Sequence, residues 1–316
     1  MNAESLLRLE EAERLDATAL ACLSAAHEAL AAVEALPDKP EDTTVAAARA
    51  LWCLAGGQRW SAMAALQHAL PSLNAAQRKH FGALVQQRLA GVPLAHLTER
   101  QRFMGLELLA GPGALIPRHE TQLLAEAAAG RLEEAARWRG DALAVDVCTG
   151  SGNVALAMAV RVPAARVCAA DLSVDAVALA RRNVQHLGLQ ARVEVQEGDL
   201  LAPFDIPEFI GAVDVLTCNP PYISSGRVPA MAAEIALHEP SLAFDGGPLG
   251  VRILQRLLRE GPRFLRPGGW LVFEVGAGQG PGVMRRLSSG AGFGELRSVS
   301  DDDGDIRVVL ARRLPT

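Results

Sequence analysis

The first part of the chain carries apolar side chains at helical spacing. Residues 3–35 are rich in alanine with leucines at helical intervals, and two prolines follow this stretch. This pattern predicts a helix or a helical pair that ends before the prolines. Two further helical blocks are predicted over 44–70 and 75–90, the second ended by a Gly-Val-Pro sequence. The first roughly 95 residues are therefore predicted to be all-helical.

The pattern changes between residues 97 and 117. Short β-like pieces occupy 102–109 and 114–116, and the sequence Gly111-Pro112-Gly113 between them is typical of a turn. We interpret this stretch as a β-hairpin connector between a helical domain and a second domain. The predicted domains are 1–96, 97–117 and 118–316.

From residue 143 onward, apolar runs of strand length alternate with helical segments. This alternation predicts an α/β domain with a mostly parallel sheet and helices on both faces. The last two predicted strands, 295–300 and 306–311, are separated by an acidic turn and should pair as an antiparallel hairpin at a sheet edge. The predicted parallel strands are 143–147, 166–170, 193–195, 213–218 and 270–275.

Composition agrees with two globular domains and argues against nucleic-acid binding. A chain of 316 residues exceeds the size at which one hydrophobic core usually stops growing. Aromatic residues make up only 4%, with Tyr222 as the single tyrosine, so a surface that stacks bases is not expected. The net charge of −5 shows no basic stripe. We therefore expect no direct contact with nucleic acid.

Cysteine usage and the N-terminus indicate where the protein works. The five cysteines are odd in number and show no metal-ligand spacing, so we expect a reduced cytoplasmic protein without a bound metal. Acidic residues stand where a signal peptide would need basic ones, and no apolar run approaches bilayer length. We expect neither export nor a membrane span.

A glycine loop follows the first predicted strand of the sheet and opens a helix. Such a loop lets the backbone approach a nucleotide closely, although by itself it is also a common structural turn. Asp171 lies 19 residues after Gly152, at the end of the second strand, where a carboxylate can hold both ribose hydroxyls. Asp199 follows the third strand and strengthens the nucleotide interpretation. The loop residues expected at the ligand are Asp146, Cys148, Thr149, Gly150, Ser151 and Gly152.

The spacing of the glycines limits the ligand. A third glycine is missing and only one Gly-x-Gly is present, which disfavours a dinucleotide with its pyrophosphate. An adenosyl ligand without phosphates, such as S-adenosylmethionine, fits better.

A second motif, Asn219-Pro220-Pro221-Tyr222, follows the fourth predicted strand. The nitrogen of an amide or exocyclic amine is a poor nucleophile because its lone pair is delocalised, so a methyltransferase must orient it. The Asn219 side-chain oxygen can accept one N–H of the substrate and the Pro220 carbonyl the other. Tyr222 is expected to wall the pocket. The alternative interpretation is a turn that merely ends a strand.

With these motifs, the sequence resembles the HemK-type protein-(glutamine-N5) methyltransferases over about residues 73–313. The resemblance implies a class I methyltransferase fold with a Rossmann-like, seven-stranded sheet and an N-terminal helical domain that docks the substrate. It implies methyl transfer from S-adenosylmethionine to the Gly-Gly-Gln glutamine of peptide chain release factors. It is carried by the two motifs above and by Gly91-Val92-Pro93-Leu94, Phe103-Met104-Gly105-Leu106, Ile116-Pro117-Arg118-His119-Glu120-Thr121, Glu239-Pro240 and Arg307-Val308-Val309.

The resemblance also implies residue roles. The loop 149–152 would line the methionine portion of the cofactor, Asp171 would hold the ribose, and Leu200 would contact the adenine. Leu172 and Asn219 are also expected to contact the cofactor. Asn219 to Tyr222 would hold the substrate glutamine, and Phe103 would close the pocket. For Arg118 and Thr121, cofactor contact competes with an interdomain salt bridge and a helix cap.

Some positions depart from the release-factor pattern. Cys148 stands where that subgroup usually has glycine, and the sister enzymes that methylate a ribosomal protein commonly carry Cys-Thr-Gly-Ser-Gly there. His119 replaces a usual proline and Leu200 a frequent aromatic residue. A ribosomal-protein substrate is therefore a second hypothesis. The sequence also leaves open adenine-N6 methylation of nucleic acid, methylation of a small molecule, and a cofactor-binding protein without turnover.

Overall fold

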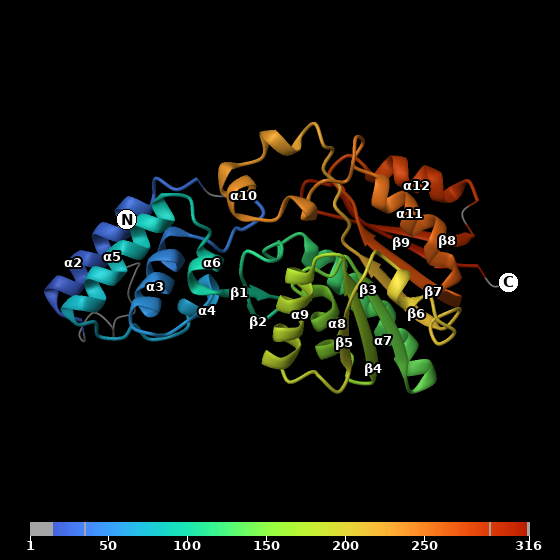
Figure 1. Cartoon of the computed structure of the whole chain (residues 1–316), viewed down its shortest axis with the longest axis horizontal. Coiled ribbons are helices and arrows are strands. Elements are labelled where there is room, and N and C mark those ends of the chain that lie inside the picture. Colours follow the sequence, from blue (N-terminus) through green and yellow to red (C-terminus); the bar gives the residue numbers. More distant parts are fainter. Residues whose placement is uncertain (1–14, 35, 291, 315–316) are drawn as a thin grey trace. The chain divides into compact units, whose positions relative to one another are not determined.

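The computed structural model describes residues 15–34, 36–290 and 292–314, and the chain forms two compact units (Figure 1). We call Met1–Pro112 with Ala232–His238 the helical unit, and Gly113–Met231 with Glu239–Thr316 the sheet unit. The part of the predicted 3–35 helix that covers residues 3–14 lies outside the described residues. No helix in the described part of the chain combines the length and apolarity needed to cross a bilayer.

The helical unit is built from short helices whose starts are capped by polar side chains. Asp16, Thr43, Ser61 and Asn74 each accept a hydrogen bond from the backbone N–H three residues later. The predicted block 44–70 is two helices, because the first ends at Gly56. The helices are α2 (Ala17–Leu30), α3 (Thr44–Ala55), α4 (Ala62–Ala65), α5 (Ala75–Leu89), α6 (Leu94–Thr98) and α10 (Ala233–His238).

The β-hairpin turns at a different place from the one the sequence predicts. Strands β1 (Arg100–Phe103) and β2 (Leu106–Leu109) pair antiparallel across Met104 and Gly105, which both have positive φ, 48° and 81°. Two consecutive residues with positive φ match the twist of a two-residue hairpin turn. Methionine rarely adopts this conformation, so the sequence does not indicate a turn at Met104. Residues 114–116 form no strand, since the Ile116 N–H donates to the buried Glu239 carboxylate instead.

The sheet unit contains one seven-stranded sheet in the order β5-β4-β3-β6-β7-β9-β8. The first five strands of this order run parallel, and β9 pairs antiparallel with both β7 and β8. The predicted parallel sheet and its antiparallel edge hairpin are confirmed. The strands are β3 (Ala142–Val147), β4 (Ala165–Asp171), β5 (Val193–Glu197), β6 (Val213–Cys218), β7 (Leu265–Glu274), β8 (Phe293–Ser300) and β9 (Ile306–Arg313).

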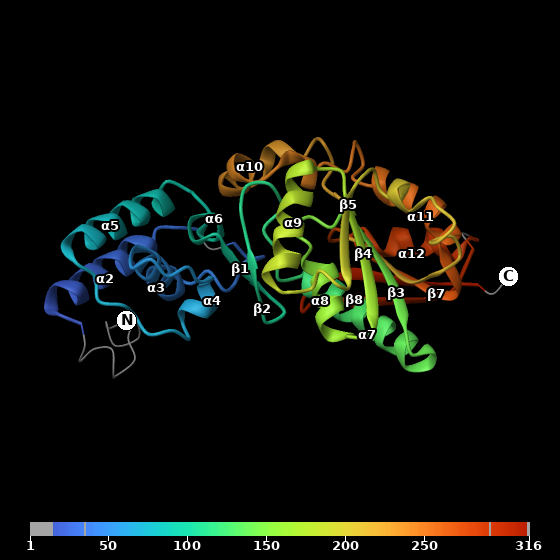
Figure 2. The ribbon, with the colours of Figure 1, turned by 60° about the horizontal axis from the view of Figure 1, so that its bottom comes forward.

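Helices cover both faces of this sheet, as Figure 2 shows, with α11 and α12 on one face and α7 and α8 on the other. Side chains alternate along β7: Leu271 and Phe273 join the core under α11 and α12, so Val272 and Glu274 point to the opposite face. The helices are α7 (Thr121–Arg139), α8 (Asn153–Arg161), α9 (Val174–His186), α11 (Arg252–Glu260) and α12 (Gly280–Ser288), with 3₁₀ turns at Ala202–Phe204, Val228–Ala230, Ser241–Ala243 and Gly261–Arg263.

Glu234 of α10 fastens its segment to the helical unit, and this gives a first prediction. Its carboxylate lies 2.6 Å from Arg88 Nη1 and 3.4 Å from Lys39 Nζ, and the side chains of Arg88 and Lys39 are buried, whereas that of Glu234 is 10% exposed. Glu234→Gln removes one of the carboxylates that interact with Lys39 and Arg88, whereas Asp42 remains beside them, and it should lower the free energy of unfolding by about 2 kcal/mol. Urea unfolding measures this loss. Glu99→Gln, which breaks the half-exposed pair with Arg59, is the control and should cost under about 1 kcal/mol; equal losses would contradict the prediction.

Candidate active site

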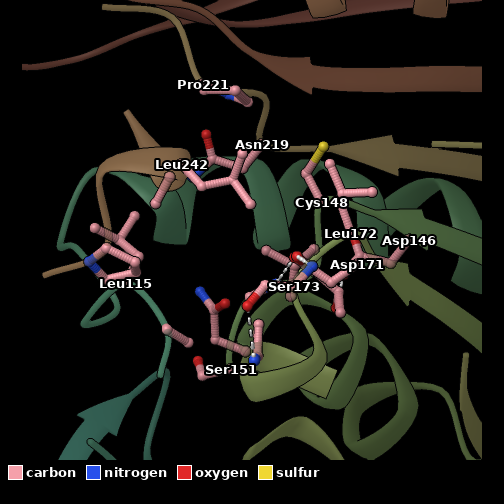
Figure 3. Close-up of a pocket in the computed structure, with 18 of the residues that line it drawn as sticks. Leu115, Asp146, Cys148, Ser151, Asp171, Leu172, Ser173, Asn219, Pro221 and Leu242 are labelled. Atoms are coloured by element: carbon pink, nitrogen blue, oxygen red, sulfur yellow. Dashed lines mark hydrogen bonds between the residues drawn. The ribbon is translucent and has the colours of Figure 1, made fainter. Parts of the chain in front are cut away.

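A cavity opens at the carboxyl edge of the parallel strands, within the sheet unit (Figure 3). It encloses about 1020 Å³, part of it open to solvent, and is lined by the loops that follow β3, β4, β5 and β6. This is where open α/β sheets bind their ligands. Of the sequence-predicted residues, the cavity is lined by Asp146, Cys148, Thr149, Gly150, Ser151, Asp171, Leu172, Asp199, Leu200, Asn219 and Pro221.

The loop after β3 bends back sharply before α8. Cys148, Gly150 and Gly152 have φ values of 57°, 56° and 84°, in the left-handed region that favours glycine. Gly152 does not line the cavity, and a Cβ there would lie 3.3 Å from Leu156, so its glycine lets the helix pack closely. Cys148 adopts the same left-handed backbone conformation although it carries a side chain.

Asp146 ties this loop to the neighbouring strand. Its carboxylate is buried and accepts hydrogen bonds from the hydroxyls of Thr149, at 2.5 Å, and Thr217 of β6, at 2.6 Å. Burial raises the pKa of Asp146 to about 6, although both hydroxyls lower it. The residue therefore holds the loop in place from beneath the cavity.

Asp171 and Ser151 offer polar groups to a ligand. Asp171 accepts the backbone N–H of Gly150 at 2.8 Å and of Ser173 at 2.9 Å, and burial raises its pKa. Each carboxylate oxygen has a further lone pair for a ribose hydroxyl. Within the described ranges no group pairs with the buried Ser151 hydroxyl, which lines the cavity. Such an unpaired polar atom fits a site that a polar ligand completes.

The side of the cavity next to the loop after β5 is apolar apart from one ion pair. Leu200, with φ of 55°, is buried against the cavity, whereas Leu172 is half exposed at its rim. Asp199 is exposed and pairs with Arg256 of α11, with Nη1 2.8 and 3.0 Å from its two oxygens. Arg256 was not predicted, because it lies 57 residues away in the sequence.

Asn219 is held by a residue whose role the sequence left open. Its side-chain N–H donates to Thr121 Oγ1 at 3.2 Å, and Thr121 is the first residue of α7 and lines the cavity. The Thr121 side chain therefore does not cap α7, whose N-cap residue is Glu120. Because the Asn219 nitrogen is engaged, its oxygen is the atom left to accept a substrate N–H.

Arg118 forms a salt bridge, but inside the sheet unit rather than between domains. Its Nη2 lies 2.6 Å from Glu239 Oε1, both side chains are buried, and Arg118 lines the cavity. The second Glu239 oxygen accepts the Ile116 N–H at 2.9 Å. Glu239 thus fixes the segment that leads into α7. Direct contact of Arg118 with a cofactor stays a prediction.

Pro220, Tyr222 and Phe103 do not line the cavity. Pro220 is buried, and the Tyr222 hydroxyl donates to Glu274 Oε1 of β7 at 3.0 Å. Phe103 lies in β1 of the helical unit and is 1% exposed. The roles predicted for these residues in substrate binding stay predictions. Glu274 belongs to none of the motifs identified in the sequence. Its contact with Tyr222, 52 residues away, could be seen only in the structure.

Packing leaves little freedom to the loop that contains Asn219. A Cβ on Gly250 would lie 2.2 Å from the Tyr222 carbonyl oxygen, and one on Gly246 would lie 2.4 Å from that of Pro221. In addition, Gln279 donates from Nε2 to the Tyr222 carbonyl at 3.1 Å. The backbone of this loop is therefore held by neighbouring backbone as well as by side chains.

The seven-stranded sheet with β9 antiparallel to its neighbours, together with the family model that matches it, assigns the fold to the class I methyltransferases. The model of the family described as "Methyltransferase domain" matches residues 144–238, and that of the "PrmC N-terminal domain" matches residues 28–98. The catalytic domain of human METTL16, solved with MAT2A 3'UTR hairpin 6, superposes with a TM-score of 0.51 at 12% identity, covering 73% of this chain and 84% of that one. At this identity the likeness concerns the fold alone.

Curated relatives are more specific. The release factor glutamine methyltransferase of Moorella thermoacetica is 38% identical over 74% of this chain and 79% of the relative. That of Xylella fastidiosa strain 9a5c is 38% identical over 76% and 83%. The chain belongs to the release factor glutamine methyltransferase family. It is an enzyme that uses S-adenosylmethionine and acts on a protein, as the sequence predicts. Within the described ranges, no His, Cys, Asp and Glu side chains gather as metal ligands.

Asp171 should carry much of the cofactor affinity. Asp171→Ala removes the acceptor for the ribose hydroxyls and also frees the Gly150 and Ser173 N–H groups, so cofactor binding should weaken roughly 10- to 100-fold. Calorimetric titration with S-adenosylhomocysteine measures this. Asp141→Ala, at an exposed position before β3, is the control and should bind normally. Unchanged affinity in Asp171→Ala would show that another group holds the ribose.

Proposed function

We propose that this enzyme transfers the methyl group of S-adenosylmethionine to the side-chain N5 of a glutamine in peptide chain release factors, within their Gly-Gly-Gln motif. The names of the curated relatives support this substrate. The observation that carries the chemistry is the hydrogen bond from the Asn219 side-chain nitrogen to Thr121. It leaves an amide oxygen at the cavity, where a substrate NH₂ group needs an acceptor.

Orientation is the main task of this site. The lone pair of an amide nitrogen is delocalised, so it attacks only if the NH₂ group is held with that lone pair toward the methyl carbon. Asn219 Oδ1 would accept one N–H and the Pro220 carbonyl the other. Pro221 follows with no backbone N–H of its own to compete for that carbonyl. These groups would fix the plane of the substrate amide.

The cofactor would supply a methyl group that is bound to a positively charged sulfur. This sulfur is a good leaving group because it becomes neutral when it loses the methyl group. The chemistry that the cofactor would supply is transfer of the methyl carbon from sulfur to the amide nitrogen, with the loss of one proton from that nitrogen. This proton is acidic once the nitrogen carries the methyl group, so a general base need not act before attack. Asp171 and the loop residues 148–151 would hold the cofactor, while Leu172 and Leu200 would cover its apolar parts.

The remaining elements fit this function as proposals. The helical unit would dock the protein substrate, in keeping with its match to the PrmC N-terminal domain. A release-factor substrate would place the enzyme in the cytoplasm. Binding of nucleic acid is not needed for the reaction, and the net charge of −5 does not favour it.

Mass spectrometry of candidate substrates tests the proposed function. Incubation with S-adenosylmethionine should add about 14 Da to the Gly-Gly-Gln peptide of a release factor, on the glutamine. Asn219→Ala should lower kcat by about 100-fold or more while cofactor affinity stays within about twofold, because only substrate orientation is lost. Label on a ribosomal protein but on no release factor would overturn the substrate assignment, and normal turnover by Asn219→Ala would overturn the mechanism.

A further inference from the structure

Glu274 is a buried carboxylate beneath the reactive loop that the reaction described above does not use. It ends β7 on the α7 face of the sheet and is 1% exposed. One oxygen accepts the Tyr222 hydroxyl at 3.0 Å, whereas no described residue meets hydrogen-bond geometry at the other, Oε2. A carboxylate is costly to bury in this way, so its presence calls for a local reason.

The carboxylate interacts with residues at both ends of the loop 219–222. Tyr222 contacts it directly. At the other end, the Thr121 hydroxyl accepts the Asn219 side-chain N–H and still has its own proton to donate, while the buried Glu274 Oε2 lacks a donor among the described residues. The Thr121 hydroxyl also lowers the pKa of the Glu274 carboxyl, which indicates that the two groups lie near each other. Thr121 therefore stands between the amide of Asn219 and the carboxylate.

The direction in which the Thr121 hydroxyl points its proton decides which atom of Asn219 faces the substrate. A carboxylate only accepts, so it draws the Thr121 hydroxyl proton toward itself. The Thr121 oxygen then accepts from Asn219, which places the Asn219 nitrogen against α7 and its oxygen toward the cavity. If Thr121 instead pointed its proton at Asn219, the amide would be stable in the flipped orientation, with NH₂ facing an NH₂ substrate.

We propose that Glu274 is a positioning residue, whose ionised side chain sets the Thr121 hydroxyl and thereby the orientation of the Asn219 amide that receives the substrate glutamine. This inference rests on the proposed function for its substrate. It adds to that function a residue that touches neither substrate nor cofactor. Through Tyr222 the same carboxylate also anchors the far end of the loop, whose carbonyl accepts a hydrogen bond from Gln279, the residue that precedes α12.

The charged groups around Glu274 make its protonation state responsive to pH. Glu120 at the start of α7 raises its pKa, and Arg307 of β9 lowers it, while Arg307 itself pairs with Glu120 at 2.9 Å and lies 3.9 Å from Asp301. Burial is the largest influence and raises the pKa of Glu274 to about 7. The carboxylate form, and with it the productive orientation of Asn219, should therefore dominate above about pH 7 and be lost below it.

Glu274→Gln tests the proposal because it keeps the shape and removes the charge. Its amide can donate to Thr121, so the hydroxyl is free to turn toward Asn219. We expect kcat to fall roughly 10- to 100-fold, affinity for S-adenosylhomocysteine to stay within about twofold, and the rise of kcat near pH 7 to disappear. Thr121→Ala, which leaves Glu274 intact, should lower kcat similarly, and Thr121→Ser should restore it.

A structural role alone would give a different pattern. Asp214→Asn is the matched control: Asp214 is a buried carboxylate at the start of β6 that accepts the Leu143 N–H and pairs with Arg139, away from the cavity. This variant should lose stability but keep the kcat of the wild type and its pH step. If Glu274→Gln and Thr121→Ala turned over at the wild-type rate with the wild-type pH profile, the proposal would be overturned.

A readout without substrate separates this proposal from the proposed function. In ¹⁵N spectra of the wild type, the side-chain NH₂ signal of Asn219, identified by its loss in Asn219→Ala, should shift with a midpoint near pH 7. The shift should be absent in Glu274→Gln. If the wild type methylates no release factor, the proposed function fails, and this titration still decides the role of Glu274. If the Asn219 signal changed neither with pH nor in Glu274→Gln, the positioning role of Glu274 would be overturned.

Discussion

The parallel pairing of β3 with β6 is the constraint on which the site depends. It sets Asp146 opposite Thr217 and Val147 opposite Cys218, so the cofactor loop and Asn219 leave the sheet side by side. Neighbouring strands lie about 4.8 Å apart, which brings the two halves of a methyl transfer within reach. The Asp146 carboxylate reinforces this pairing because it accepts hydrogen bonds from hydroxyls of the loop and of β6.

The site holds its shape through close backbone contacts and buried charge. Glycines at 246 and 250 let the chain pass against the carbonyls of Pro221 and Tyr222, at distances that no side chain allows. Two carboxylates, Asp146 and Glu274, are buried under the cavity with pKa values of about 6 and 7. Both features cost stability, and both hold a loop whose orientation matters to within a fraction of an ångström.

Local signals in the sequence were enough to predict the sheet and part of the lining of the cavity. Apolar runs of strand length, the glycine loop and Asn219-Pro220-Pro221-Tyr222 each depend on neighbours in the chain, so their pattern predicts the structure. The hairpin turn was misplaced because Met104 adopts a glycine-like conformation that no residue type announces. Phe103 stays a predicted substrate contact.

The supports of Asn219 could not be predicted, for a physical reason. Thr121 lies 98 residues from Asn219 and Glu274 lies 52 residues from Tyr222, and nothing in the spacing of these residues marks them as partners. They meet because α7 packs on the face of the sheet to which Glu274 points. Contacts of this kind follow from tertiary packing alone, whereas the reactive motif itself is continuous in the chain.

The central claim is that Asn219 presents its side-chain oxygen, and not its nitrogen, to the substrate amide. A crystal structure of the enzyme with S-adenosylhomocysteine and a Gly-Gly-Gln peptide tests this most directly. We predict that the glutamine NH₂ group donates to Asn219 Oδ1 and to the Pro220 carbonyl, while the Asn219 nitrogen still donates to Thr121. A peptide amide bound elsewhere, or one whose carbonyl accepts from the Asn219 nitrogen, would contradict it.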